Sequence, residues 1–248
     1  MGPLIKHMGS PGLGSVRYWV VLISVISMGL IFSILINGKN RDLKITPITK
    51  PGVRAVHIDS VRELDGEKYY QKGVLLSRGK DIRGAVKNFK LARNIFDELS
   101  DQRLMALANL KLAMCYRILN NNQVSLDYFE AALDISSQNG FIMYEAKALQ
   151  GIGYVYNSLG FYEKAIINVR EALDIHQYIN EKRGEALDWL IMGTIAVNLD
   201  TNEAGDCFRR AIAISKTIGH TMIEDRACGL LKKWSTHSSK HSPLLSTL

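Results

Sequence analysis

The chain has 248 residues, a net charge of +7, 47% hydrophobic residues, five prolines and three cysteines. This composition is ordinary for a globular chain, so it excludes collagen, wholesale disorder and a polytopic membrane protein. Three scattered cysteines are too few for a disulfide framework, and the sequence has no CxxC pair for zinc binding or thiol redox chemistry.

The first predicted element is a membrane-spanning helix over residues 18–36, which carry no charge and follow an N-terminal tail. At ~1.5 Å per residue this helix is roughly 28 Å long, close to the thickness of a bilayer's hydrocarbon core. Aromatic and basic residues favour the headgroup region of a bilayer. The predicted helix has Tyr18 and Trp19 at one end and Lys39 beyond the other. A cleaved signal peptide is the alternative, but the apolar run is long for one and no A-x-A-like cleavage site follows it. We therefore expect a single-pass membrane protein, with a tail of residues 1–17 before the span.

The predicted span is followed by a linker over residues 37–59, where Pro47, Pro51 and Gly52 occur among basic residues without a helical period. Basic residues are nearly balanced across the span, so the sequence leaves open which side of the membrane holds the rest of the chain. Residues 1–60 carry a net charge of +5. Most of the positive charge therefore belongs to the predicted anchor and its flanks, which favours bilayer headgroups over a ligand as its partner.

Beyond the linker the sequence repeats with a period of forty residues. The repeat is marked by small residues at Gly73, Ala113, Gly153 and Gly193. Each unit continues with helical spacing, as in Ala165, Val169 and Ala172 of the third unit. Two closely packed antiparallel helices need such small residues where their axes approach, and a bulky side chain one turn away to fill the wedge. The pattern predicts four helical hairpins, with Asp81, Asp101 and Thr201 as helix N-caps.

The units resemble the tetratricopeptide repeat, most clearly in the third unit, where residues 153–165 read GYVYNSLGFYEKA. The small residue, the tyrosines, the turn glycine and the alanine stand at the family's offsets. Other units match less fully, with Leu76 and Ala196 where tyrosine is expected and Asn120 in place of the turn glycine. The resemblance covers residues 61–217, and a forty-residue period is similar to the long-helix variety of the repeat found in kinesin light chains.

The resemblance implies an all-α fold, a solenoid of four helical hairpins with a C-terminal capping helix, preceded by the single transmembrane helix. The predicted repeats cover about residues 61–99, 100–139, 140–180 and 181–219. The capping helix over residues 220–234 completes a domain of residues 60–234 by covering the open face of the last repeat. The Ser- and His-rich residues 235–248 are predicted to be a disordered tail.

No catalytic, cofactor-binding or metal-ligating pattern stands out from the sequence. The six histidines form no H-E-x-x-H motif. Gly151 and Gly153 lack the third glycine and the preceding strand of a dinucleotide site, so they are interpreted as helix-packing glycines. The chain also has no Walker lysine motif and no G-x-S-x-G motif. We therefore expect no enzyme, no cofactor, no metal and no small-molecule substrate.

The resemblance implies a concave groove, lined by the first helix of each hairpin, that receives a peptide or helix of a partner. Matching the family's groove positions residue by residue gives the candidate partner-binding residues Tyr70, Arg78, Met114, Arg117, Lys147, Gln150, Tyr154, Asn157 and Asn198. The carboxylate clamp of chaperone-binding repeats is absent, because Val74 and Met114 stand where it needs asparagine. Aromatic, apolar and cationic side chains together suit an amphipathic or mildly acidic segment.

The predicted function is that of a membrane-anchored scaffold or adaptor that binds a partner protein during assembly or organisation of a membrane-associated complex. Tethering would raise the effective concentration of the partner at the membrane. An RNA-binding helical repeat is an alternative. Against it, residues 61–217 carry twenty basic and twenty acidic residues, whereas binding nucleic acid needs a cationic surface. A purely structural subunit of a larger membrane complex also stays open.

Overall fold

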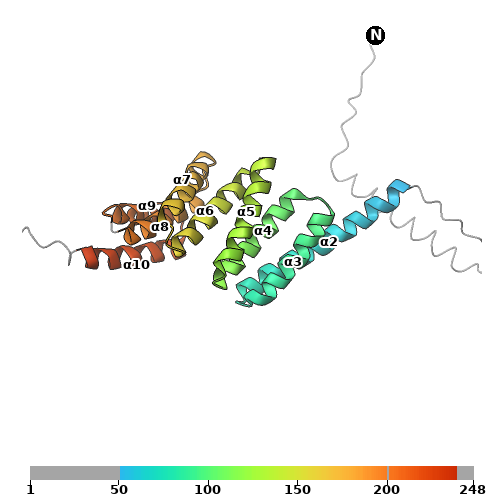
Figure 1. The fold of residues 1–248 in the computed structure, drawn as a ribbon, viewed down its shortest axis with the longest axis horizontal. Coiled ribbons are helices and arrows are strands. Elements are labelled where there is room, and N and C mark those ends of the chain that lie inside the picture. Colours follow the sequence, from blue (N-terminus) through green and yellow to red (C-terminus); the bar gives the residue numbers. More distant parts are fainter. Residues whose placement is uncertain (1–50, 200, 239–248) are drawn as a thin grey trace, which may run out of the picture. The chain divides into compact units, whose positions relative to one another are not determined.

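A computed structural model describes residues 51–199 and 201–238 of the chain (Figure 1). The predicted transmembrane helix of residues 18–36 lies outside this part, as do the N-terminal tail and the first residues of the linker. Among the described residues, no helix combines the length and the apolar character needed to cross a membrane.

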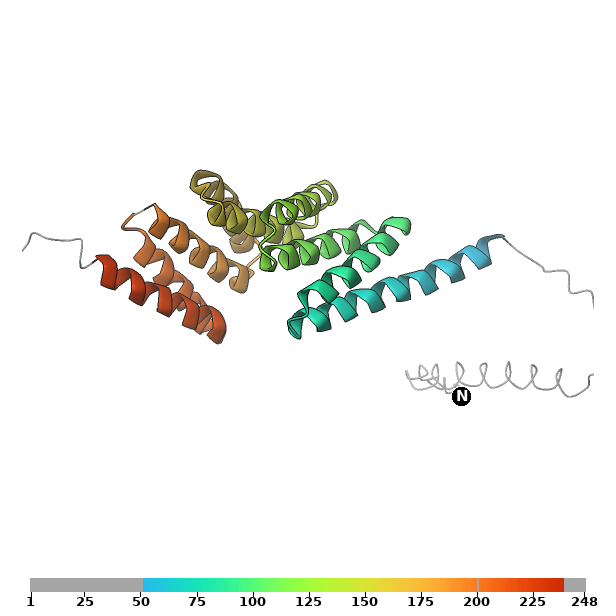
Figure 2. The same cartoon turned by 60° about the horizontal axis from the view of Figure 1, so that its bottom comes forward.

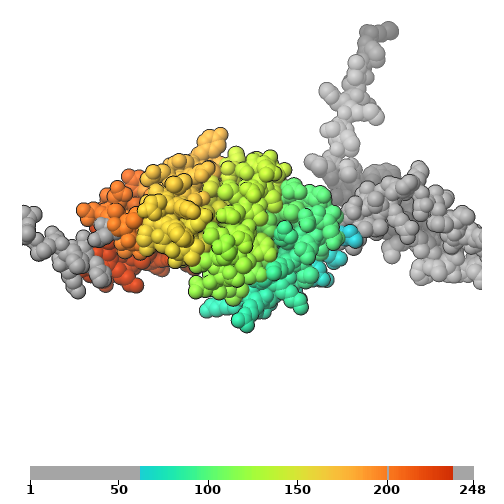
Figure 3. All heavy atoms as spheres, in the orientation of Figure 1, coloured from blue at the N-terminus to red at the C-terminus, as the bar shows by residue number. Residues whose placement is uncertain are grey.

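All regular secondary structure among the described residues is α-helical, as expected for an all-α solenoid. The helices are α2 (Pro51–Arg78), α3 (Ile82–Glu98), α4 (Gln102–Ile118), α5 (Asn122–Asn139), α6 (Ile142–Ser158), α7 (Tyr162–Tyr178), α8 (Lys182–Asn198), α9 (Ala204–Thr217) and α10 (Thr221–Ser238). Each helix packs against the next, and α4, α6, α8 and α10 also contact one another in succession (Figure 2). The side chains of each hairpin adjoin those of the following hairpin (Figure 3). The second-neighbour contacts define an inner row of helices.

Two helices extend beyond their predicted limits. Helix α2 begins at Pro51, so residues 51–59 of the predicted linker are helical. Proline suits this position, because the first turn of a helix does not need its missing N–H. Helix α10 continues to Ser238 and so includes the first four residues of the predicted tail. It packs against α9 and α8 and covers the end of the last hairpin.

Single residues in the left-handed conformation end most of the described helices. They follow α2 to α7 and α9, at Lys80, Ser100, Asn120, Gly140, Gly160, Asn180 and Gly219. From Lys80 to Asn180 they recur every twenty residues, which is half of the sequence repeat. A left-handed residue is a common way to end a helix, because it lets the following N–H groups bond to the last free carbonyls.

Two of the three predicted N-caps are confirmed. The Asp81 and Asp101 carboxylates accept hydrogen bonds of 2.9 Å from the backbone N–H groups of Gly84 and Leu104. The prediction for Thr201 is wrong, because α9 begins only at Ala204. The Thr201 hydroxyl instead donates to the carbonyl of Ala196, at the end of the preceding helix. The second half of the fourth unit begins thirty-nine residues after that of the third, at Ala204 against Ala165, and this unit has a longer turn and a shorter second helix.

The small residues that mark the repeat lie where helices approach one another, as expected. A Cβ atom at Gly73 would lie 2.7 Å from the Phe89 ring, and one at Gly193 would lie 2.5 Å from the Phe208 ring. Both rings are almost completely buried. Phe89 of α3 and Phe208 of α9 therefore each fill the space left by a glycine of the preceding helix.

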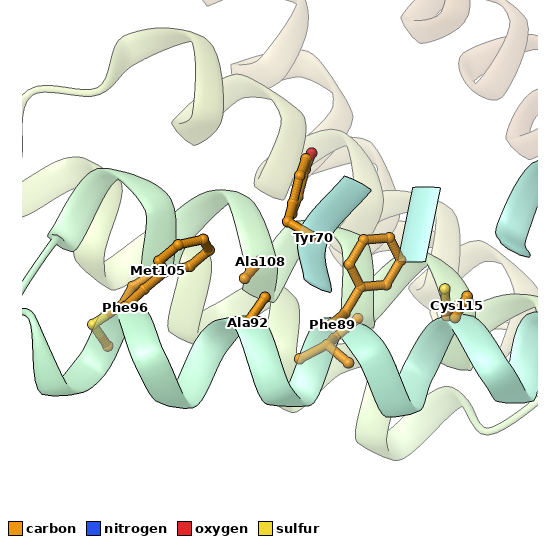
Figure 4. Packing of buried hydrophobic residues seen from close by; sticks show 9 residues of the cluster. Tyr70, Phe89, Ala92, Phe96, Met105, Ala108 and Cys115 are labelled. Atoms are coloured by element: carbon orange, nitrogen blue, oxygen red, sulfur yellow. The ribbon is translucent and has the colours of Figure 1, made fainter. Parts of the chain in front are cut away.

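Tyr70 belongs to the first of these packed clusters, although the sequence predicts it as a groove residue. Its side chain is only 9% exposed, and its ring centroid lies 5.5 Å from that of Phe89 (Figure 4). The cluster also contains Phe96, Met105 and Ala108, from α3 and α4. Tyr70 therefore stabilises the contact between the first two hairpins and is not available to a partner.

The ionisation of Tyr70 gives a test of this burial. Burial, with the nearby charge of Glu67, raises the pKa of Tyr70 to about 12. The unfolded chain releases this proton near pH ~10, so the folded state binds more protons between the two values and stability falls as the pH rises through them. We expect a loss of at most about 2.7 kcal/mol. Chemical denaturation from pH 9 to pH 12 should show a smaller loss for Tyr70→Phe than for the unaltered chain. Tyr178→Phe, at a site that is 83% exposed, serves as the control and should leave the loss unchanged.

Candidate functional site

A groove with a volume of about 370 Å³ runs along the inner helices α4, α6 and α8 and reaches α10. Its walls come from one face of each inner helix, at the three- and four-residue spacing that places side chains on the same side. The contributions are Leu107, Leu110, Lys111, Met114 and Arg117 from α4, Lys147, Gln150 and Tyr154 from α6, and Arg183, Leu187, Leu190, Ile191 and Thr194 from α8. Arg226 from α10 completes the lining at the far side.

The structure brings together five of the nine predicted site residues. The groove is lined by Met114, Arg117, Lys147, Gln150 and Tyr154. Arg78 stands exposed in the last turn of α2, outside this lining. The inner helices thus supply the groove as the family pattern implies. The other four predicted residues, Tyr70, Arg78, Asn157 and Asn198, lie outside its lining.

Asn157 and Asn198 connect two hairpins and do not line the groove. The Asn157 side-chain amide donates a 3.1 Å hydrogen bond to the Thr194 hydroxyl. The Asn198 amide donates a 3.0 Å bond to the side-chain oxygen of Asn157. These bonds hold the ends of α6 and α8 in register, so we assign both asparagines a positioning role between repeats.

The groove has a strong positive charge. Its lining includes five basic residues, Lys111, Arg117, Lys147, Arg183 and Arg226, against the single acidic residue Glu181. Within residues 51–199 and 201–238, none of these five cations forms an ion pair. Burial and the neighbouring charges of Lys147 and Arg183 hold the pKa of Lys111 below its usual value. The charges are therefore uncompensated, although the repeats as a whole are neutral.

Two arginines converge on Tyr154 inside the groove. The guanidinium carbon of Arg117 lies 4.3 Å from the Tyr154 ring centroid, a cation–π distance. Burial alone raises the pKa of Tyr154, but the hydrogen bonds and charges of Arg226 and Arg117 outweigh burial and hold this pKa below its usual value. Arg226 of the capping helix thus lowers the pKa of Tyr154, which lies in α6, two hairpins earlier.

A buried polar network forms part of the groove floor. Nδ1 of His176 lies 2.6 Å from one Asp188 oxygen, and the Gln150 amide donates a 2.7 Å bond to the other. His176 and Asp188 are fully buried. Burial raises the pKa of Asp188, although the bonds from His176 and Gln150 favour its charged form. Gln150 links this network to the groove surface and, with a 3.2 Å bond to the Gly184 carbonyl, fixes α6 against α8.

Comparison with known families identifies the repeat. Residues 106–139 and 146–177, which correspond to α4–α5 and α6–α7, match the family model of the tetratricopeptide repeat. These two segments are tetratricopeptide repeats. Tetratricopeptide repeat protein 29 of Trypanosoma brucei brucei is 24% identical to it over 162 residues, or 62% of this chain and 34% of that protein. The chain thus spans about a third of the length of this relative.

Solved structures share the fold of this repeat array at low sequence identity. A Rap protein complexed with competence and sporulation factor has a TM-score of 0.65 and 18% identity, covering 87% of this chain and 67% of that one. Aspartyl phosphate phosphatase F from Bacillus subtilis has a TM-score of 0.63 and 16% identity, covering 68% and 45%. The Rap conjugation gene regulator of the plasmid pLS20, in complex with the Phr* peptide, has a TM-score of 0.54 and 14% identity, covering 94% and 68%. This chain spans less than half of the phosphatase, and these likenesses show the fold alone.

Proposed function

We propose that this chain is a scaffold or adaptor that binds an acidic, partly apolar segment of a partner protein in the groove of its tetratricopeptide repeats. The observation that carries the proposal is the set of five unpaired cations around the groove. Apolar side chains lie between them, including Leu107, Leu110 and Leu187. Apolar anchors supply binding energy, whereas complementary charges supply orientation, specificity and a faster encounter.

The solved relatives support a peptide as the occupant. The Rap conjugation gene regulator, which has this fold, is in complex with the Phr* peptide. Recognition of a helix or an extended segment by a groove is a recurrent mode of peptide binding. An anionic segment would neutralise Lys111, Lys147 and Arg183, which the chain leaves without acidic partners among its described residues.

We also propose that residues 18–36 anchor the repeats to a membrane, on a side that the sequence leaves open, and that the bound partner belongs to a membrane-associated complex. The uncharged apolar run and its flanking aromatic and basic residues support this part of the proposal. With an anchor of this kind, a modest affinity of the groove suffices for recruitment, because both partners are confined to one surface.

Selection of peptides by the full chain tests the proposal. The probe is a display library of random twelve-residue peptides, panned against the chain in detergent micelles. We expect the selected peptides to be enriched in Asp and Glu together with Leu, Ile or Phe. The double substitution Lys111→Ala and Lys147→Ala should weaken the selected peptides about tenfold, since it removes two of the five groove cations.

The matched control removes two exposed cations from outer helices, Lys87→Ala and Arg170→Ala, and should leave peptide affinity within twofold. A labelled oligouridylate is measured in parallel at physiological salt. Equal losses of peptide affinity in the two double variants would overturn the groove assignment. Tighter binding of the oligouridylate than of the selected peptides would favour the RNA-binding alternative instead.

A further inference from the structure

We infer that the capping helix α10 is part of the binding surface, and that Arg226 joins Arg117 and Tyr154 in a subsite for one anionic side chain of the bound segment. The inference rests on the proposed peptide-binding function and specifies one contact within it. It changes the role of α10 from covering the last repeat to selecting the ligand.

The three side chains come from separate parts of the array. Arg117 lies in the last turn of α4, Tyr154 in α6 and Arg226 in the first half of α10. All three line the same groove, and the Arg117 guanidinium carbon lies 4.3 Å from the Tyr154 ring centroid. The curvature of the array therefore brings its capping helix to residues that lie more than seventy positions earlier in the sequence.

The subsite has an excess of donors and positive charge. Two guanidinium groups share the groove lining with the Tyr154 phenol, and neither is paired with a carboxylate within the described part of the chain. Like charges in one groove repel each other. Arg117 and Tyr154 are half-buried, so water screens the repulsion incompletely.

An oxyanion meets every requirement of this arrangement. It neutralises both arginines, and each arginine presents a planar fork of N–H donors that matches two oxygens of a carboxylate or a phosphate. The Tyr154 hydroxyl adds a further donor. The shared chemistry is an anionic side chain, either the carboxylate of Asp or Glu or a phosphorylated residue, and the test distinguishes these sources.

The neighbouring cations do not form an equivalent cluster. Lys111, Lys147 and Arg183 also line the groove, but among the described residues they have no aromatic side chain beneath them. They provide a positive field along the groove, whereas the Arg117–Tyr154–Arg226 subsite offers fixed donors at one place. A bound segment is thus held in one register by its anionic residue at this subsite.

The first measurement uses free anions and so does not depend on a peptide. The probes are acetate and inorganic phosphate, titrated against the full chain in micelles with 13C-labelled tyrosine. We expect a saturable shift of the Tyr154 ring signal, assigned with Tyr154→Phe. Arg226→Gln should abolish the shift or raise the apparent Kd about tenfold. Lys232→Gln removes a cation from an exposed position of the same helix and should leave the titration unchanged.

The second measurement uses the peptides selected from the random library. Each Asp or Glu of a peptide is replaced in turn by its amide and by phosphoserine, and each version is tested against the unaltered chain and Arg226→Gln. One acidic position should lose about tenfold in affinity on amidation, and this loss should disappear in Arg226→Gln. Retention of affinity by phosphoserine at that position identifies phosphate as an accepted source, and its loss identifies a carboxylate.

The outcomes separate the two proposals. If Arg226→Gln alters neither the anion titration nor peptide affinity, the subsite is refuted, while loss of peptide binding in the Lys111 and Lys147 double variant would still support the groove. If the library yields no acidic peptides, the proposed function fails, while an Arg226-dependent anion titration would still support the subsite. Circular dichroism of Arg226→Gln should match that of the unaltered chain, because the Arg226 side chain is exposed.

Discussion

Replacement of Asp188 by alanine is expected to lower the free energy of unfolding by about 3 to 5 kcal/mol. Asp188 is fully buried, and its two oxygens face His176 at 2.6 Å and the Gln150 amide at 2.7 Å. Alanine removes both acceptors at once: His176 Nδ1 loses its partner in the interior, at a substantial desolvation cost, and the Gln150 amide keeps only its bond to the Gly184 carbonyl. For a domain of this size the thermal midpoint should fall by roughly 10 °C.

Thermal unfolding followed by circular dichroism measures this change. The matched control is Asp174→Ala, which removes an exposed carboxylate from α7 and should shift the midpoint little. Asp188→Asn keeps an acceptor for Gln150 but removes the negative charge opposite His176. Its thermal midpoint should therefore lie between those of Asp188→Ala and Asp174→Ala. Equal midpoints for Asp188→Ala and Asp174→Ala would show that the network does not stabilise the α6–α8 contact.

Replacement of Phe208 by alanine is the second large effect, with an expected loss of about 3 to 5 kcal/mol. The Phe208 ring has no exposed surface and packs against Gly193. The surroundings cannot close the void, because the residue facing it is a glycine without a side chain to move. Phe208→Leu fills part of the space and should cost less.

Phe161→Ala is the control for Phe208→Ala, because the Phe161 ring is 53% exposed. The free energy of unfolding of Phe161→Ala should fall by less than about 1 kcal/mol. Urea unfolding at neutral pH compares the variants. A loss for Phe208→Ala as small as that for Phe161→Ala would contradict the packing of α9 against α8.

The hairpins could be predicted from the sequence because the repeat has a direct physical cause. Gly73 and Gly193 recur where helices touch, and Phe89 and Phe208 recur where the gaps must be filled. The turn at Thr201 could not be placed in the same way. The second half of the fourth unit recurs thirty-nine residues after that of the third, not forty, and this spacing does not show how the turn and the following helix divide the missing residue.

The groove could be predicted only in part. Family offsets identified Arg117 and Tyr154, because both lie on inner helices that the repeat pattern covers. Arg226 was missed because it belongs to the capping helix, outside the repeat, and only the curvature of the array brings it to Tyr154. The positive charge of the groove was hidden as well, since the neutral sum over the repeats combines inner and outer faces.

The buried network left a signal in the sequence that pattern matching to the family does not use. His176 follows Ala165, Val169 and Ala172 at the spacing of the buried face of α7, where an apolar residue is expected. Asp188 likewise lies within the buried face of α8. Polar residues at core positions of two consecutive helices indicate that they pair with each other, because neither is stable alone in the interior.

The left-handed residues at twenty-residue intervals make the array modular. Residues 141–180 begin directly after Gly140 and end at Asn180, so a second copy of this segment could be joined at both ends without changing any helix terminus. A cassette of twenty residues would instead exchange inner and outer helices. Each added forty-residue cassette would lengthen the groove and carry Arg226 one hairpin further from Arg117. The number of hairpins between Arg117 and Arg226 therefore sets the distance between these two groove arginines.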